Sequence, residues 1–364
     1  MKGKQPLVSV FIPYYNDAKF LRKSIECVLN QTYENWELIL LNHATTDECR
    51  EIAHSYTDKR IRHIDMQQNY GAGGGILFKK MLGQAKGKYI KPCCADDELL
   101  ENCLSDLVEY MENNSQTSYA FGRVACINDS SEPIDGVFFE NYGFNIHNNN
   151  VDELVLFKKG IGHSPWPAVI FRTEDLRHID IDSILIMEFD MSLYLNLLLQ
   201  EKNVGFLDKV VVNYRLHESQ MSRDNENHNI SFINNFEIPV FLSFFFKLKS
   251  IKLAKEVFFD SKYINDIDSG DEHLIPFVIA HYFAYADDLS ANKIGYDKLY
   301  EILSDDDLRQ EIENKFNYTV ADFRQRYKTH PVMKEIIKEQ HCHKHKWFYK
   351  DGKKIVVFGV KIKG

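Results

Sequence analysis

The sequence lacks any run of eighteen apolar residues, about the length that a membrane-spanning helix needs. It also lacks an excess of positive charge, because its 364 residues carry a formal net charge of −9. Proteins that bind nucleic acid generally present a net basic face to phosphate, so a general nucleic-acid binder is excluded. An anionic ligand would have to be held locally, by a metal ion or by a few placed donors.

The seven cysteines form an odd set without the spacing of a structural zinc site. They are Cys27, Cys49, Cys93, Cys94, Cys103, Cys126 and Cys342. Reduced thiols in a cytosolic protein are the simplest interpretation. The opening residues, MKGKQPLVSVFIPYYN, are too polar for a secretory signal. We therefore expect a cytoplasmic protein, in solution or at the inner face of the cell membrane.

The first hundred residues alternate between strand and helix patterns. Short apolar runs at 7–12, 37–41, 61–65 and 88–92 are typical of strands, and the segments between them have helical spacing. This alternation is typical of βαβ units, so we predict an α/β fold with a mostly parallel central sheet flanked by helices.

After residue 100 the alternation loosens, and beyond an Asn-rich stretch near residue 225 the pattern becomes helical. We expect a sheet domain over 1–225, a mainly helical C-terminal domain over 226–340 and a basic tail over 341–364.

Two adjacent carboxylates, Asp96 and Asp97, follow the strand expected at 88–92. Like charges side by side repel, so solvent, a cation or a partner must offset the repulsion. One interpretation is that these acids only begin the next helix, near its positive end. The other is that they offer hard oxygen ligands to Mg²⁺ or Mn²⁺, which would neutralise an anionic ligand. Cys94 is a soft thiol and is expected to pack rather than coordinate.

Five ordered segments resemble the family 2 glycosyltransferases of Rossmann-like GT-A fold, of the bacterial surface-polysaccharide type. They are VSVFIPYYNDAKFLRKSIECVLNQTYENWELILL, NYGAGGGILFKKMLGQAKGKYIKPCCADDELL, PWPAVIFRTEDL, MEFDMSLYLNLLL and VVVNYRLHESQMS. One such motif would be weak, whereas their order over residues 7–223 is specific.

This resemblance implies an inverting, metal-dependent hexosyltransferase. Its donor would be a nucleotide diphosphate sugar, preferably a UDP-sugar. Its acceptor would be a hydroxyl of a glycan or lipid-linked glycan. Capsule or lipopolysaccharide assembly is the implied setting.

The resemblance implies that Pro13, Tyr14 and Tyr15 line the nucleotide base. The chain departs from the family after the second expected strand. There the triplet that begins at Asn42 reads NHA, where the family usually has two aspartates and a glycine. Asn42 is the residue that we expect to take the place of the usual base contact.

For the diphosphate, the resemblance implies that Asp96 approaches the ribose or phosphate and that Asp97 ligates Mn²⁺ or Mg²⁺. His217 would face the metal or the diphosphate. An arginine that the family often carries before the acidic motif is absent, and Lys79 or Lys80 is expected to replace it.

Two carboxylates in MEFDMSLYLNLLL, Glu188 and Asp190, are candidates for the catalytic base. If a helix starts near Asp190, that aspartate suits the cap position, where backbone N–H groups would hold it. Glu188 then stays free to point into the cleft, in the place of the family's catalytic aspartate. The alternative, a solvated Glu188 with Asp190 as the base, stays open.

Three further features have two interpretations each. GAGGG at 71–75 lacks a phosphate-loop frame and is expected to be a turn that allows close backbone approach beside the donor site. His163 and Trp166 are expected to shape the acceptor pocket, although Trp166 suits the core equally well. HCHKH at 341–345 matches no zinc pattern, so a basic tail is favoured.

Two other classes of protein remain open at this point. A nucleotidyltransferase would need a Gly-rich, Arg-bearing loop after the first strand, where this chain has PYYNDAKF. A catalytically silent sugar-binding or scaffold protein would have lost the acids at the metal and base positions, and this chain retains them.

The basic tail generates a first prediction. Residues 334–364 hold nine lysines against three acids, and each basic residue near an anionic surface contributes about 1 kcal/mol. Deletion of 341–364 should therefore weaken sedimentation with anionic vesicles at low salt and leave transfer to a soluble acceptor largely intact. Equal vesicle binding with and without the segment would contradict membrane contact.

Overall fold

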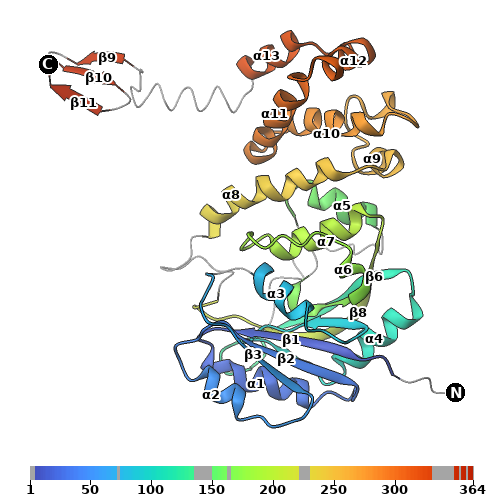
Figure 1. Ribbon diagram of the computed structural model, residues 1–364, viewed down its shortest axis with the longest axis vertical. Coiled ribbons are helices and arrows are strands. Elements are labelled where there is room, and N and C mark those ends of the chain that lie inside the picture. Colours follow the sequence, from blue (N-terminus) through green and yellow to red (C-terminus); the bar gives the residue numbers. More distant parts are fainter. Residues whose placement is uncertain are drawn as a thin grey trace. The chain divides into compact units, whose positions relative to one another are not determined.

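The computed structural model has a central sheet of eight strands (Figure 1). Their order in the sheet is β3-β2-β1-β4-β7-β6-β8-β5. The structure describes residues 5–71, 74–134, 150–161, 165–220, 230–329, 348–351, 354–357 and 360–363. The strands are β1 (Val8–Tyr14), β2 (Trp36–Asn42), β3 (Ile61–Asp65), β4 (Tyr89–Pro92), β5 (Glu98–Leu99), β6 (Thr117–Ile127), β7 (Val169–Arg172) and β8 (Asn203–Arg215).

Most neighbours in this sheet are parallel. β1 pairs in parallel with β2 and β4, β2 with β3, and β6 with β8. The short strands β5 and β7 pair antiparallel with their neighbours. The predicted α/β fold with a mostly parallel sheet is confirmed, and the strands expected at 7–12, 37–41, 61–65 and 88–92 are β1 to β4.

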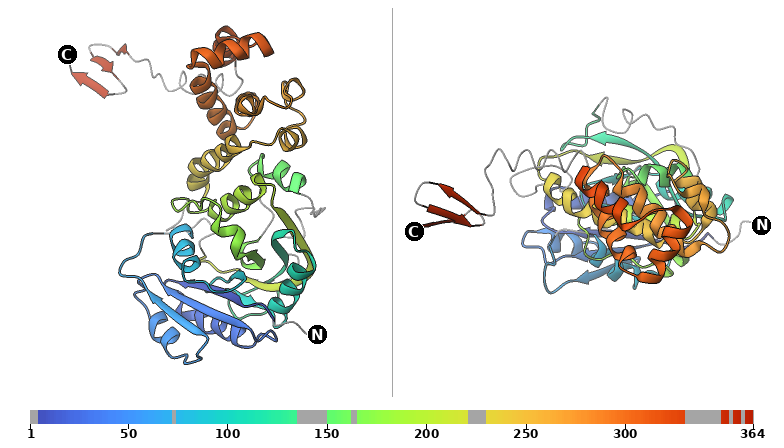
Figure 2. Two further views of the ribbon diagram at one scale, coloured as in Figure 1. Left: turned by 45° about the vertical axis from the view of Figure 1, so that its right-hand side comes forward. Right: turned by 90° about the horizontal axis from the view of Figure 1, so that it is seen from above.

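Helices cover both faces of the sheet (Figures 1 and 2). Around the sheet lie α1 (Ala18–Leu29), α2 (Cys49–His54), α3 (Gly75–Leu82), α4 (Cys103–Asn113), α5 (Asn150–Phe157), α6 (Thr173–Arg177), α7 (Phe189–Leu199), α8 (Ile230–Ser243) and α9 (Ile251–Val257), with the 3-10 turns η1 (Trp166–Ala168) and η2 (Phe244–Lys247).

Side chains of β1 alternate between the two faces of the sheet and pack against the helices on each face. Val10 and Ile12 point into the core cluster that α1, α2 and α4 complete. Phe11 points the other way and contacts Phe78 of α3, with ring centroids 5.7 Å apart. Side chains alternate across a strand, so a strand that is apolar throughout is buried on both faces.

The chain divides into two compact units, Met1–Val257 and Phe258–Gly364. The first unit therefore extends past residue 225, where we expected the boundary, and includes α8 and α9. Part of the reason is packing: Phe241 of α8 meets Phe157 of α5 edge to face, with centroids 5.8 Å apart.

The second unit is mainly helical, which confirms the expected helical C-terminal region. It contains η3 (Ile264–Asp266), η4 (Glu272–Leu274), α10 (Ile275–Ala284), α11 (Leu289–Leu303), α12 (Asp306–Phe316) and α13 (Val320–Thr329). Within the expected basic tail, β9 (Phe348–Asp351), β10 (Lys354–Val357) and β11 (Val360–Lys363) form an antiparallel sheet. In the described ranges, no helix is both long and apolar enough to cross a membrane.

The glycines that open α3 allow close approach, as expected of GAGGG, but their neighbours are protein groups. A Cβ on Gly74 would lie 2.8 Å from the Phe189 ring, and one on Gly75 would lie 2.3 Å from the Asp182 carbonyl oxygen. Helix α3 is therefore seated directly on the chain that leads into α7.

Gly75→Ala should consequently destabilise the protein by about 1–3 kcal/mol, because backbone cannot move aside as a side chain can. Gly83→Ala, at the other end of α3, is the matched control, since its Cβ would meet nothing closer than 3.6 Å. Urea unfolding of both variants measures the difference. Equal stability of the two would contradict the close packing at Gly75.

Candidate active site

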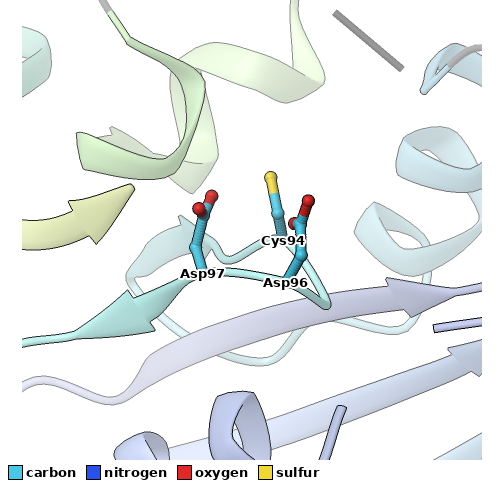
Figure 3. A group of neighbouring side chains, drawn as sticks. All are labelled: Cys94, Asp96 and Asp97. Carbon is cyan, nitrogen blue, oxygen red and sulfur yellow. The ribbon is translucent and has the colours of Figure 1, made fainter. Parts of the chain in front are cut away.

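A cluster of acidic and thiol side chains follows β4. Cys94, Asp96 and Asp97 each place a ligand-type atom within 4.8 Å of the others. Figure 3 shows the three side chains projecting to the same side of the loop. Because ligands of α/β sheets bind outside the carboxyl ends of the strands, this is where the fold predicts a site.

A buried arginine holds the loop in place. Arg215, at the end of β8, is fully buried. Its backbone N–H donates to Asp97 Oδ1 at 2.8 Å, and its Nε donates to the Asp96 carbonyl oxygen at 2.7 Å. From α1, the Ser24 hydroxyl contacts the carbonyl oxygens of Ala95 and Asp97 at 2.7 and 2.8 Å. The backbone of the loop is thus fixed from two sides, and its carboxylates keep one orientation.

Asp97 is buried, and so is its Oδ2 atom. Oδ2 has no hydrogen-bond partner among the described residues. Burial, with the nearby Asp96, raises the pKa of Asp97 well above its usual value. A buried carboxylate oxygen without a partner is costly, and a divalent cation would remove that cost. The donor set at this loop therefore fits a hard cation.

Cys94 lies within reach of the same site but remains a thiol. Burial, with Asp97 and Asp96 close by, raises the pKa of its thiol well above the usual value. Only the thiolate is a good metal ligand, so Cys94 is a weak ligand beside two carboxylates.

Asp96 contacts His217, the residue after Leu216 at the end of β8. His217 Nε2 lies 3.0 Å from Asp96 Oδ2, and its Nδ1 lies 2.9 Å from the Ser219 hydroxyl. Asp17 at the start of α1 joins this pair: burial first, then the Asp96 charge, raise the pKa of Asp17 to about 6. The structure thus brings His217 to Asp96, while the group with metal-ligand spacing consists of Cys94, Asp96 and Asp97.

At the end of β2, the Asn42 amide is already engaged on both sides. Its Nδ2 donates to Asp65 Oδ1 at 2.9 Å, and its Oδ1 accepts from the Thr45 N–H at 2.8 Å. The Arg50 side chain lies 3.4 Å from the same Asp65 carboxylate. Asn42 therefore organises the ends of β2 and β3, and its amide has a second N–H and a second lone pair that these two bonds do not use.

Aromatic rings lie beside Asn42. Tyr15 is 42% exposed, and its ring meets His43 edge to face at 6.2 Å. His43 stacks on Tyr70 at 6.3 Å and accepts the Tyr70 N–H at Nε2. Pro13 is half-buried, whereas Tyr14 is only 2% exposed and belongs to the core. Of the three residues expected at the base, Tyr15 is the one whose side chain is exposed to solvent.

The start of α7 corrects the expected cap. Glu188, not Asp190, occupies the cap position, and its side chain makes no capping bond. Asp190 lies inside the first turn, where its Oδ1 accepts the Met191 N–H at 2.7 Å. The prediction that Asp190 caps the helix was wrong because α7 begins at Phe189. Asp190 is thus hydrogen-bonded through Oδ1, whereas Glu188 Oε2 has no partner among the described residues.

Glu188 is a buried carboxyl group in an acidic environment. It is 6% exposed, and its Oε2 has no hydrogen-bond partner in the part of the chain that the structure describes. Burial, with Asp190 and Glu237 nearby, raises the pKa of Glu188 to about 8. Burial also raises the pKa of Asp190 to about 6, against the bond from Met191. A carboxyl group with a pKa near neutrality suits proton transfer at physiological pH.

Tyr194 of α7 is buried near charged or thiol groups of both regions. Burial, with Asp190 and later Cys94 among the contributing groups, raises the pKa of Tyr194 well above its usual value. Trp166 has an intermediate exposure and packs against Phe78 and Phe189, with centroids 5.4 and 5.5 Å away. It thus belongs both to the aromatic core beside α7 and to the partly open surface.

The remaining expected residues have simpler positions. Lys79 and Lys80 are exposed on α3. His163 lies outside the described residues. The contacts of Ser24, Arg215 and Glu237 join segments far apart in the chain, so the local sequence pattern does not predict them. Arg215 did stand in a segment that we singled out for its resemblance.

Solved structures with the same fold bear on the class of protein. TarS of S. aureus (residues 1–349), in complex with UDP-GlcNAc, superposes with a TM-score of 0.55 at 15% identity over 98% of this chain and 99% of that chain. The mannosyltransferase PcManGT of Pyrobaculum calidifontis, in complex with GDP-Man and Mn²⁺, gives 0.50 at 14% identity over 89% and 87%. At such low identity the likeness shows the fold, which is the GT-A fold of glycosyltransferases.

Sequence comparison then gives the family. Residues 9–179 match the model of glycosyl transferase family 2. Residues 9–179 thus form a domain of the family 2 glycosyltransferase type, in agreement with the resemblance.

Individual relatives cover parts of the chain. The uncharacterized glycosyltransferase MJ1057 of Methanocaldococcus jannaschii is 28% identical over 58% of this chain and 71% of its own length. The putative teichuronic acid biosynthesis glycosyltransferase TuaG of Bacillus subtilis is 29% identical, over 37% of this chain and 53% of its own. GlyG of Streptococcus pneumoniae is 35% identical over 29% and 35%.

The unsatisfied oxygen of Asp97 generates a prediction. Asp97→Asn should leave the unfolding temperature of the metal-free protein unchanged or higher, because it removes a buried charge. The same variant should lose the stabilisation by Mn²⁺, which amounts to about 2.7 kcal/mol at a hundredfold excess over Kd. Glu101→Gln, at an exposed position, is the control for loss of charge. A normal response of Asp97→Asn to Mn²⁺ would refute a metal at this loop.

Proposed function

We propose that this glycosyltransferase is an inverting, metal-dependent enzyme in which Glu188 is the catalytic base. The observation that carries the proposal is the buried Glu188 carboxyl group at the start of α7, on the face of the sheet where α3 packs; its Oε2 has no hydrogen-bond partner among the described residues. Its pKa of about 8 is that of a group that accepts a proton near neutral pH.

The reaction follows from this assignment. The Glu188 carboxylate takes the proton of an acceptor hydroxyl as the hydroxyl oxygen attacks the anomeric carbon of the donor sugar. The bond from that carbon to the phosphate oxygen breaks, and the nucleoside diphosphate leaves with the electron pair. Attack opposite the leaving group inverts the anomeric configuration, and Glu188 then returns its proton to solvent.

Mn²⁺ or Mg²⁺ would be held by Asp96 and Asp97, and when bound it neutralises charge on the leaving diphosphate. His217 keeps Asp96 in place through the contact at 3.0 Å. Pro13 and Tyr15 line the nucleotide base, which is preferably uracil. Lys79 approaches the phosphates. Trp166 would bind the acceptor, because aromatic faces are common platforms for sugar rings, and His163, outside the described residues, stays a candidate for the same role.

A glycan or lipid-linked glycan of a bacterial surface polysaccharide is the acceptor that we infer. The name of TuaG, which refers to teichuronic acid biosynthesis, supports this setting. The lysine-rich segment over 341–364 would then bring the enzyme to the inner face of the membrane, where such acceptors are held.

The pH dependence of transfer tests the base. Glu188→Gln should lower the rate roughly 10²–10⁴-fold with donor binding nearly unchanged. In the wild-type enzyme, kcat/KM should fall as the pH drops below about 8, because protonation removes the base. Release of nucleoside diphosphate, measured with UDP-GlcNAc and GDP-mannose as trial donors, gives the rate.

A stability measurement separates loss of chemistry from misfolding. Because the pKa of Glu188 is raised on folding, its contribution to stability is complete below the unfolded value and is lost as the pH rises through about 8. Glu188→Gln should therefore be no less stable than the wild type at pH 8. Asp190→Asn is the comparison: if it abolished turnover while Glu188→Gln kept it, the two roles would have to be exchanged.

A further inference from the structure

The segment that leads into α7 has no regular secondary structure, yet its backbone N–H groups are hydrogen-bonded to side chains. Five consecutive N–H groups, from Ile184 to Glu188, all donate to carboxylates. Asp182 Oδ1 accepts the first two, at 2.7 and 3.0 Å. This is a local turn of the kind that aspartate commonly forms.

The other three N–H groups are bound by a residue about fifty positions away. Glu237 Oε1 accepts from Ile186 at 2.6 Å, and Oε2 accepts from Met187 and Glu188 at 2.7 and 3.0 Å. Glu237 comes from α8, beyond the boundary expected at 225, and is 8% exposed. It is the sole charged residue between positions 230 and 246.

The Glu237 carboxylate needs these hydrogen bonds because it is buried. Burying a carboxylate in an apolar helix is unfavourable, and three N–H donors offset that cost. The donors lie at the start of α7, where the helix dipole also favours a negative charge. One of the three is the N–H of Glu188 itself.

We propose that Glu237 is a positioning residue for the catalytic carboxylate: by binding Ile186–Glu188 it fixes the backbone from which the Glu188 side chain projects. This inference rests on Glu188 being the base. It makes α8, which lies outside the residues matched by the family model, part of the catalytic machinery.

Charge gives Glu237 a second effect on Glu188. The groups that face the Glu188 carboxyl are Asp190 from α7 and Glu237 from α8, and both raise its pKa after burial does. Removal of the charge at 237 should therefore lower the pKa of Glu188 and move the acidic limb of the rate profile to lower pH. A purely structural role would leave that limb in place.

The decisive experiment needs no substrate. In the full chain with ¹³C-labelled glutamate carboxyls, Glu188→Gln identifies the Glu188 resonance, and titration gives its pKa. In Glu237→Gln this titration should move to lower pH, and amide exchange over 186–188 should accelerate at least tenfold. An amide has a single accepting oxygen, so Gln cannot bind all three N–H groups. Exchange reports the opening of these bonds directly.

Two variants separate charge from hydrogen bonding. Glu237→Asp keeps the charge on a shorter side chain, so exchange should accelerate while the titration of Glu188 stays near that of the wild type. Asp182→Asn keeps the one oxygen that accepts from Ile184 and Leu185, and should change neither exchange nor titration at 186–188. If Glu237→Gln does not fold, faster exchange in Glu237→Asp is the required result.

With UDP-GlcNAc or GDP-mannose as the trial donor, Glu237→Gln should also lower kcat roughly 10- to 100-fold, as expected when a catalytic group is displaced, with KM for the donor unchanged. Wild-type titration and exchange in Glu237→Gln would overturn the role of Glu237. Full turnover by Glu188→Gln would instead remove the proposed base itself.

Discussion

Arg215 has a permanent positive charge in a fully buried position, and the loop that holds Asp96 and Asp97 is arranged around it. Its guanidinium reaches the Asp96 carbonyl, the Asn128 carbonyl at 2.6 Å, the Ser131 hydroxyl and the Glu98 carboxylate. Removing one partner of a buried charge is strongly destabilising, so this network has one stable geometry. The same interaction therefore stabilises the edge of the sheet and orients the acids of the site.

The positions of the acids themselves lower the stability of the fold. Asp97 and Glu188 each have a buried oxygen without a hydrogen-bond partner in the described structure, and each has a raised pKa. Their positions are kept by groups that bind backbone: the Ser24 hydroxyl and the Arg215 side chain at the first, and Glu237 at the second. Each acid thereby keeps one oxygen that the described residues do not hydrogen-bond, Oδ2 of Asp97 and Oε2 of Glu188, although Asp97 Oδ1 accepts the Arg215 N–H.

The features of the fold and site that depend on neighbouring residues in the sequence could be predicted from it. Periodicity and turn residues gave the strands β1 to β4 and the parallel sheet, and the family's ordered motifs pointed to Asp96, Asp97 and Glu188. The cap of α7 was misplaced because the sequence offers two acids two residues apart, and only the backbone decides which one precedes the helix. Arg215 and Glu237 act through segments more than a hundred and about fifty residues away, a relation that no local pattern contains.

We propose that the loop after β4 and the start of α7 form one site for a nucleotide sugar. Diffraction from crystals soaked with Mn²⁺ and UDP-GlcNAc or GDP-mannose, recorded at the manganese absorption edge, tests it most directly. The account predicts an anomalous peak about 2.1 Å from oxygens of Asp96 or Asp97, with the diphosphate on the metal and the sugar facing Glu188. A nucleotide sugar bound away from both acidic regions, or a metal held elsewhere in the chain, would contradict it.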